Sequence, residues 1–273
     1  MRNFNNTVFI GKVWQHFDNL PSTNEFLSFS RENAKITEGV VVSTFNQTDG
    51  RGQMGNRWLS EAYQNIAVSI LLQPSFLHIS EQFHLNKAMA LAVHDFIVDE
   101  IRIEDKNNKY DFVPTHVQTT HQVNVKWAND VLINDKKVAG ILIQNTVSNN
   151  TLQSCIIGIG VNINQLHFDK NLNATSLTLE TGRSYDLFTL LERLAQCVEK
   201  RYLQLKSYDF TALHAEYLSK LYRFETEHLF KYTDTNTPFY GKIMNVSPIG
   251  KLEILTNKGI EAFDIKEIKF VFE

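Results

Sequence analysis

The sequence predicts an α+β protein in which a mixed sheet with flanking helices is followed by a small antiparallel β-barrel. Strand-like runs cluster around a few helical segments and do not alternate strictly with them, which favours α+β over a βαβ fold. From Glu225 onward the pattern changes to short alternating runs separated by turns, as in small barrels. Because 273 residues exceed what one core usually organises, we expect two domains, 1–224 and 225–273.

Composition narrows the class of protein. Apolar residues make up 43% of the chain and include 19 Phe, enough for a substantial core, which excludes a disordered chain. A net charge of −3 gives no reason to expect a nucleic-acid binder, so any cationic site must be local. Cys155 and Cys197 are too few for a disulfide framework or a thiolate metal cluster. Because no apolar run can cross a bilayer and no signal-peptide pattern opens the chain, we expect a cytoplasmic protein without membrane contact.

Five segments are expected in the first half of the larger domain. A helix over 22–36 is predicted because Ser and Thr precede an apolar-periodic run there. β-branched residues predict a strand over 40–45, and a second buried run predicts a strand over 65–72. Helical spacing of apolar residues predicts a helix over 80–101. The polar stretch 104–122 is expected to be a loop insertion.

The second half is expected to complete the sheet and add the barrel. Turns at Asn129-Asp130 and Asn134-Asp135 separate the first two of three predicted strands. These strands cover 123–127, 138–146 and 154–164. Two helices are predicted after them, over 184–207 and 209–221. The barrel strands are predicted over 239–246, 251–255, 260–263 and 268–272.

A glycine-rich segment, Gly50-Arg51-Gly52-Gln53-Met54-Gly55, matches the pattern G-x-G-x-x-G. A dinucleotide-binding fingerprint must open a helix and meet an acidic residue about 20 positions later. Here another strand follows, and positions 70–73 carry no carboxylate, so the dinucleotide interpretation fails. What remains is a mobile loop with one arginine, suited to closing over an anionic ligand.

Two lysines lie at strand ends downstream of this loop. Lys126 opens the segment Lys126-Trp127-Ala128-Asn129-Asp130, and Lys137 begins an apolar strand. A lysine at a strand end is often simply solvated. Together with Arg51, however, these lysines could neutralise a phosphate that a carboxylate must attack. Gly158 and Gly160 lie inside a strand, where they serve either tight packing or close approach of a ligand.

Five segments, by their order and spacing, resemble those of biotin–protein ligases over residues 14–180. They are Ser22-Thr23-Asn24, 47–55, 126–130, 137–142 and 158–164. The resemblance implies a class II synthetase-like ligase domain and an SH3-like C-terminal barrel. Only 21 residues precede Ser22, too few for the winged-helix DNA-binding domain that some relatives carry. The resemblance therefore implies a monofunctional biotin–[acetyl-CoA-carboxylase] ligase that does not bind DNA.

The same resemblance implies which residues form the site. Catalytic roles are implied for Arg51, Lys126 and Lys137. Contacts with biotin are implied for Ser22, Thr23, Asn24, Gln47, Arg51, Gly52, Gln53, Lys137 and Gly140. Contacts with ATP or the adenylate are implied for Arg51, Trp58, Lys126, Asn129 and Asn162, and a metal contact for Asp130. Ser22 or Thr23 can cap the predicted helix at the same time.

The implied reaction has two steps. The carboxylate of biotin attacks the α-phosphate of ATP, which gives biotinyl-5′-AMP and pyrophosphate. A lysine of a biotin carboxyl carrier protein then attacks this mixed anhydride. Both reactants of the first step are anions, so cations and Mg²⁺ are needed to bring them together. Relatives can dimerise through a sheet edge, and a homodimer is therefore one expectation.

Two glutamines depart from the family pattern, and two other functions stay open. Gln53 stands where many relatives have arginine, and Gln144 stands where glutamate is frequent. A neutral Gln53 could weaken retention of the adenylate, whereas we expect Gln144 to be structural. One alternative function is acyl transfer like that of a lipoate–protein ligase. The other is that of a catalytically silent biotin-binding regulator, which the presence of Arg51 and Lys137 disfavours.

Overall fold

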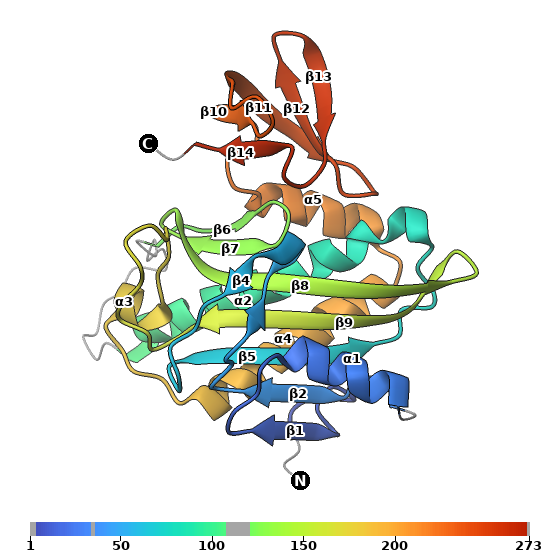
Figure 1. Ribbon diagram of the computed structural model, residues 1–273, viewed down its shortest axis with the longest axis vertical. Coiled ribbons are helices and arrows are strands. Elements are labelled where there is room, and N and C mark those ends of the chain that lie inside the picture. The colour runs from blue at the N-terminus through green and yellow to red at the C-terminus, as the bar shows by residue number, and fades with distance from the viewer. Residues whose placement is uncertain (1–3, 34–35, 108–120, 272–273) are drawn as a thin grey trace.

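A seven-stranded mixed sheet organises the larger part of the chain (Figure 1). The computed structural model describes residues 4–33, 36–107 and 121–271. The strand order is β1-β2-β5-β9-β8-β7-β6, in which β1 and β2 run parallel and the other five neighbouring pairs are antiparallel. The strands are β1 (Trp14–Phe17), β2 (Val41–Thr44), β5 (Asn65–Leu72), β6 (Val123–Lys126), β7 (Asp130–Ile133), β8 (Lys136–Ser148) and β9 (Thr151–Asn162). The predicted α+β class is confirmed.

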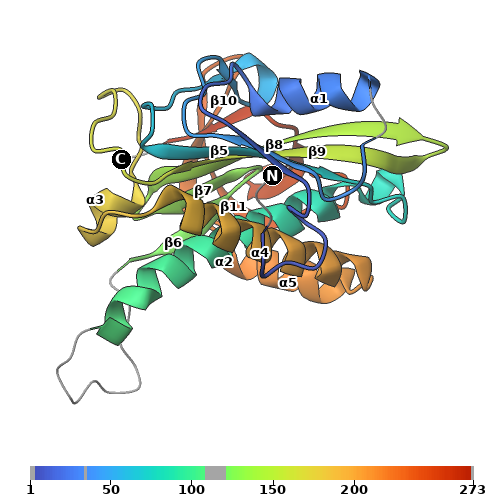
Figure 2. The ribbon, with the colours of Figure 1, turned by 90° about the horizontal axis from the view of Figure 1, so that it is seen from below.

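Helices cover both faces of this sheet. Figure 2 shows α1 (Thr23–Asn33) on one face and three helices on the other, namely α2 (Phe83–Asn107), α4 (Leu187–Lys206) and α5 (Phe210–Lys220). A strand covered on both faces needs apolar side chains at successive positions, not only at alternate ones. Every residue of β5 is accordingly buried, and the prediction of this strand from its continuous apolar run is confirmed.

The C-terminal part is an open antiparallel sheet. Its order is β13-β12-β11-β10-β14, and among the described residues the edge strands β13 and β14 do not pair with each other. Its strands are β10 (Glu227–Tyr232), β11 (Pro238–Val246), β12 (Leu252–Thr256), β13 (Gly259–Phe263) and β14 (Ile268–Phe270). The predicted closed barrel is therefore wrong in this respect. Closure would need β14 to pair along both of its edges, and this three-residue strand pairs only with β10.

Short elements are where the sequence prediction failed. The turn predicted around Asn129-Asp130 is in fact followed at once by strand β7, which is too short to show a period. A two-residue turn then leads into β8, and positive φ at Asn134 and Asp135 suits a tight hairpin. Five further elements were not predicted: β1, β10, the short helix α3 (Leu177–Thr181) and the two hairpin strands described with the cavity.

Helix α2 is longer than predicted. It runs to Asn107, so residues 104–107, predicted as the start of a loop insertion, are helical. Most of the predicted insertion, 108–120, lies outside the described residues. By contrast, helix α1 begins where predicted, and the Glu25 backbone N–H donates to Ser22 Oγ over 3.4 Å. That contact is the N-cap expected from the sequence.

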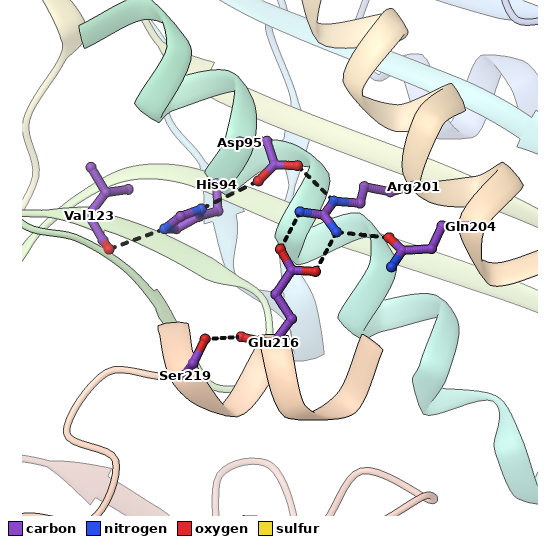
Figure 3. A network of polar contacts seen from close by, with 7 residues as sticks. All are labelled: His94, Asp95, Val123, Arg201, Gln204, Glu216 and Ser219. Carbon is purple, nitrogen blue, oxygen red and sulfur yellow. Dashed lines mark hydrogen bonds and ion pairs between the residues drawn. The ribbon is translucent and has the colours of Figure 1, made fainter. Parts of the chain in front are cut away.

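A buried polar network joins the three helices behind the sheet (Figure 3). Arg201 of α4 donates to Asp95 of α2 over 2.7 Å and to both carboxylate oxygens of Glu216 of α5 over 2.6 Å. The Arg201 side chain is only 8% exposed. Because a bidentate arginine fixes the direction of its partners, this network sets how α2, α4 and α5 lie against one another.

Candidate active site

A cavity of about 490 Å³ lies between the central sheet, the start of α1 and the C-terminal sheet. This volume falls in the range of small-molecule sites, about 300–1,000 Å³. Its lining includes most of the residues singled out from the sequence: Ser22, Thr23, Asn24, Gln47, Arg51, Gly52, Gln53, Trp58, Lys126, Asn129, Asp130, Lys137 and Gly140.

Glycines of β8 and β9 lie beneath side chains that enter the cavity. A β-carbon at Gly158 would overlap the Asn24 amide, and one at Gly160 would overlap the Trp58 indole. The indole also lies against Gly140. These glycines are therefore required for tight packing of side chains, the first of the two interpretations left open from the sequence. The groups that approach them are side chains of the cavity itself.

The first turn of α1 presents uncharged polar groups to the cavity. Ser22, Thr23 and Asn24 are each no more than 4% exposed. Gln47 Oε1 accepts a hydrogen bond from the Thr23 backbone N–H over 2.9 Å. Ser22 also caps the helix, so capping and a place in the cavity wall hold for the same residue.

The glycine-rich segment forms a short hairpin over the cavity. Strands β3 (Gly50–Arg51) and β4 (Arg57–Trp58) pair, and a 3₁₀ turn, Gln53–Gly55, connects them. Arg51 forms an ion pair with Glu25 of α1. From the opposite side, Lys266 Nζ donates to the Met54 carbonyl over 2.7 Å. The hairpin is thus held by α1 and by the loop between β13 and β14.

Replacing Lys266 by alanine is expected to loosen this hairpin. One hydrogen bond is worth about 1 kcal/mol, so local opening should increase about fivefold. The measurement is the rate of tryptic cleavage after Arg51 and Arg57 in the ligand-free protein. Lys269→Ala is the matched control, because it removes a lysine of the same segment that also lines the cavity but has no hydrogen bond to the hairpin in the described structure. Equal cleavage rates in the two variants would contradict the contact.

The cavity is strongly cationic. Of the residues that the structure describes, six lysines and arginines and one carboxylate, Asp130, line it. The cationic residues are Arg51, Arg57, Lys126, Lys137, Lys266 and Lys269. Lys137 Nζ lies 2.6 Å from Asp130 Oδ1 and 5.5 Å from the centre of the Trp58 ring. A concave surface lined by one sign of charge concentrates ligands of the other sign. This cavity is therefore suited to anions.

Lys126 lies deeper in the same wall. Its Nζ is 5.3 Å from the centre of the Phe270 ring. Burial lowers the pKa of Lys126, the charge of Asp130 opposes that shift, and the charge of Lys137 adds to it. An anion bound between the two lysines would favour their charged forms, which gives the site an electrostatic reason to hold a phosphate.

Two residues singled out from the sequence have other contacts. Asn162 does not line the cavity; it is buried and donates to the Thr175 carbonyl over 3.0 Å. Asn129 does line it, but its amide donates to the Ile141 carbonyl over 2.6 Å. Gln144 is exposed on β8 and outside the lining, which fits the expectation that it has no catalytic role.

Sequence reasoning missed the contribution of the C-terminal sheet. Its lining residues are Ile265, Lys266, Ile268, Lys269 and Phe270. They follow Lys137 by more than 120 positions, and no motif marks them. The contact between the two parts also includes Trp127, whose indole N–H donates to the Gly250 carbonyl over 2.9 Å.

Asp130 is the single acidic side chain of the lining. Among the residues that the structure describes, no group of three His, Cys, Asp or Glu side chains is placed to hold a metal ion. Mg²⁺ commonly keeps several waters and binds one or two carboxylates together with substrate phosphates. The residues therefore fit an ion that arrives with a nucleotide, and they do not form a preassembled protein cage.

Comparisons with known proteins agree with this geometry. The family model "Biotin/lipoate A/B protein ligase family" matches residues 16–162. The bifunctional ligase/repressor BirA of Bacillus subtilis is 30% identical over 260 residues, which cover 93% of this chain and 73% of the relative. The biotin–[acetyl-CoA-carboxylase] ligase of Paracoccus denitrificans is 27% identical, covering 72% and 78%.

Among solved structures, the biotin protein ligase from Aquifex aeolicus in complex with biotin and ATP aligns with a TM-score of 0.72 at 24% identity. The alignment covers 95% of this chain and 100% of that structure, so the likeness extends over the C-terminal sheet. The fold is therefore shared along nearly the whole length. Together with the match over more than half of the chain, this establishes that the protein belongs to the biotin/lipoate A/B protein ligase family.

Proposed function

We propose that this chain is an ATP-dependent biotin–protein ligase, which activates biotin as biotinyl-5′-AMP and transfers it to a lysine of a biotin carboxyl carrier protein. One observation carries the proposal. A single cavity is lined both by the uncharged polar groups of Ser22, Thr23 and Asn24 and by the cations Arg51, Lys126 and Lys137. The uncharged polar groups suit the polar ring of biotin. The cations suit the biotin carboxylate and the α-phosphate of ATP, which react with each other.

In the first step an oxygen of the biotin carboxylate forms a bond to the α-phosphorus of ATP, while the bond from that phosphorus to the bridging oxygen breaks and pyrophosphate leaves. Both reactants are negatively charged, so their approach is opposed in a poorly solvated cavity. Lys126 and Lys137 stabilise the charge that accumulates on the phosphate, and Arg51 can exchange its partner Glu25 for the ligand. Mg²⁺, when bound with the nucleotide at Asp130, supplies further charge neutralisation.

In the second step the neutral amine of the carrier lysine attacks the carbonyl carbon of the anhydride. The carbon–oxygen bond to phosphate breaks, AMP leaves, and the nitrogen loses a proton. The anhydride is already activated, so the main task of the protein is to exclude water. The hairpin 50–58, held by Glu25 and Lys266, is the element that covers the cavity for this purpose.

A cyclic urea fits the polar groups better than the dithiolane ring of lipoate. Ser22, Thr23, Asn24 and Gln47 line the cavity with hydrogen-bonding side chains, and a dithiolane offers neither donors nor strong acceptors. Polar groups left without partners by an apolar ligand cost binding energy, so such a site rejects it. The names of the relatives point the same way.

We place the reaction in the cytoplasm, with the carrier protein as macromolecular partner. Both Cys155 and Cys197 are free, which fits a reducing compartment. Burial raises the pKa of each thiol to about 12, so neither is a candidate nucleophile. Among the described residues, no helix combines the length and apolar character needed to cross a membrane.

The test is exchange of labelled pyrophosphate into ATP with Mg²⁺ and biotin, lipoate or no acid. Exchange that depends on biotin is the expected result, because the first step is reversible. Exchange that depends on lipoate would instead favour a lipoate–protein ligase. Tight biotin binding in calorimetry without any exchange would favour a silent regulator.

A further inference from the structure

Ser69 is a polar residue within the apolar run of β5, and its side chain is fully buried. Buried hydroxyl groups are almost always hydrogen-bonded. Ser69 Oγ lies 2.8 Å from Thr23 Oγ1 and 2.5 Å from Asn24 Oδ1. Both partners line the cavity, whereas Ser69 itself does not. Ser69 therefore contacts two residues of the cavity wall without lining the cavity itself.

The Asn24 amide lies across three neighbouring strands. Ser69 of β5 pairs with Gly158 of β9, which in turn pairs with Leu142 of β8. Asn24 Oδ1 meets the Ser69 hydroxyl, and Asn24 Nδ2 faces the Leu142 carbonyl over 3.5 Å. Gly158, between them, leaves the space that the amide occupies. A reversed amide would bring two carbonyl oxygens together at Leu142, so this row fixes which way Asn24 points.

The direction of each hydrogen bond follows from proton count. Ser69 has one hydroxyl hydrogen, and Asn24 Oδ1 can only accept, so that hydrogen goes to Asn24. The contact of 2.8 Å between the two hydroxyl oxygens then requires Thr23 to donate to Ser69. Gln47 Oε1 accepts from the Thr23 backbone N–H over 2.9 Å and lies 3.3 Å from the Thr23 hydroxyl oxygen, farther than Ser69 Oγ does. The Thr23 oxygen is consequently left as an acceptor toward the cavity.

We propose that Ser69 is a positioning residue for the ligand ring, because it sets the orientation of the Asn24 amide and makes the Thr23 hydroxyl a hydrogen-bond acceptor. The inference rests on the proposed function, since an acceptor at this place suits the N–H groups of a cyclic urea. Ser69 acts on the ligand only through Thr23 and Asn24. Its loss therefore affects recognition of the ring and leaves the phosphate chemistry at Lys126 and Lys137 unchanged.

The test compares Ser69→Ala with wild type by calorimetry with biotin and by steady-state pyrophosphate exchange. Without Ser69 the Thr23 hydroxyl keeps only its longer contact to Gln47 Oε1, 3.3 Å, and the Asn24 amide loses the contact that fixes its direction. We expect Kd and KM for biotin to rise about tenfold, the effect of one hydrogen bond, with KM for ATP and kcat at saturating biotin unchanged.

Ser43→Ala is the matched control. Ser43 is an equally buried serine of the same sheet, and its Oγ contacts Trp14 Nε1 and His16 Nδ1 but no cavity residue. This variant should lose thermal stability and keep wild-type affinity for biotin.

Unchanged biotin affinity in Ser69→Ala, or an equal rise in KM for biotin and for ATP, would overturn the positioning role alone. A wild-type chain that does not bind biotin would overturn the proposed function and this inference with it.

Discussion

Replacing Lys137 by alanine is expected to slow biotin-dependent pyrophosphate exchange by about 100- to 1,000-fold without unfolding the protein, the usual effect of deleting one preorganised charge at a reacting centre. Lys137 Nζ lies in the cavity wall, held by Asp130 over 2.6 Å and covered by the Trp58 ring. Its position is fixed before the ligand arrives, so little reorganisation is needed when charge develops on the phosphate. The loss should fall mainly on kcat, because that charge is largest in the transition state.

Lys136→Ala is the control for this experiment. Lys136 is the exposed neighbour on the same strand and does not line the cavity, so its removal changes the net charge by the same amount. Exchange in this variant should stay within twofold of wild type, an order-of-magnitude allowance for a distant screened charge. Arg51→Ala is expected to act in the same direction as Lys137→Ala. Wild-type exchange rates in both Arg51→Ala and Lys137→Ala would contradict the catalytic role proposed for these two residues.

Replacing Arg201 by methionine is expected to lower the free energy of unfolding by about 3 kcal/mol, since it takes the guanidinium away from two partly buried carboxylates. Arg201 joins Asp95 of α2 and Glu216 of α5 from α4, and its side chain is 8% exposed (Figure 3). At about 2–4 °C per kcal/mol, the unfolding temperature should fall by roughly 10 °C. Differential scanning calorimetry measures this directly.

An exposed ion pair provides the comparison. Arg57 and Asp49 lie 2.8 Å apart with side chains 73% and 45% exposed. Surface pairs of this kind contribute about 0–1 kcal/mol, so Arg57→Ala should hardly move the unfolding temperature. A fall as small in Arg201→Met as in Arg57→Ala would show that the helix network does not stabilise the fold.

The same network predicts how stability depends on pH. Burial by itself would raise the pKa of Asp95, but hydrogen bonds from His94 and Arg201 outweigh it and lower the pKa to about 2 from its usual 3.8. The folded protein therefore holds this carboxylate in its charged form more strongly than the unfolded chain does. About 2 kcal/mol of stability should be present above pH 4 and be lost as the pH falls from about 4 to 2. In Arg201→Met this part of the acid dependence should shrink, which unfolding curves between pH 2 and 5 would reveal.

The sequence by itself determined those features whose cause is local. Apart from Asn65 and Ser69 the run 65–72 is apolar on both faces of the strand, which predicts a strand covered on both faces. Ser22 precedes an apolar-periodic run and caps it. The motif residues around Arg51, Lys126 and Lys137 could be singled out because each lies in a short segment with a recognisable order, and the structure brings all three to one cavity.

Only the tertiary structure decided which distant segments complete that cavity. Lys266 and Phe270 reach it because β14 pairs with β10 and leaves the C-terminal sheet open, and periodicity carries no information about which strand edges meet. No sequence pattern marks Ser69, and only the strand register and the packing of α1 bring Gly158 and Asn24 beside it. The physical reason is the same in each case. Hydrogen-bond partners and charge neighbours are set by packing between elements far apart in the chain, whereas a local pattern reports only which face of an element is buried.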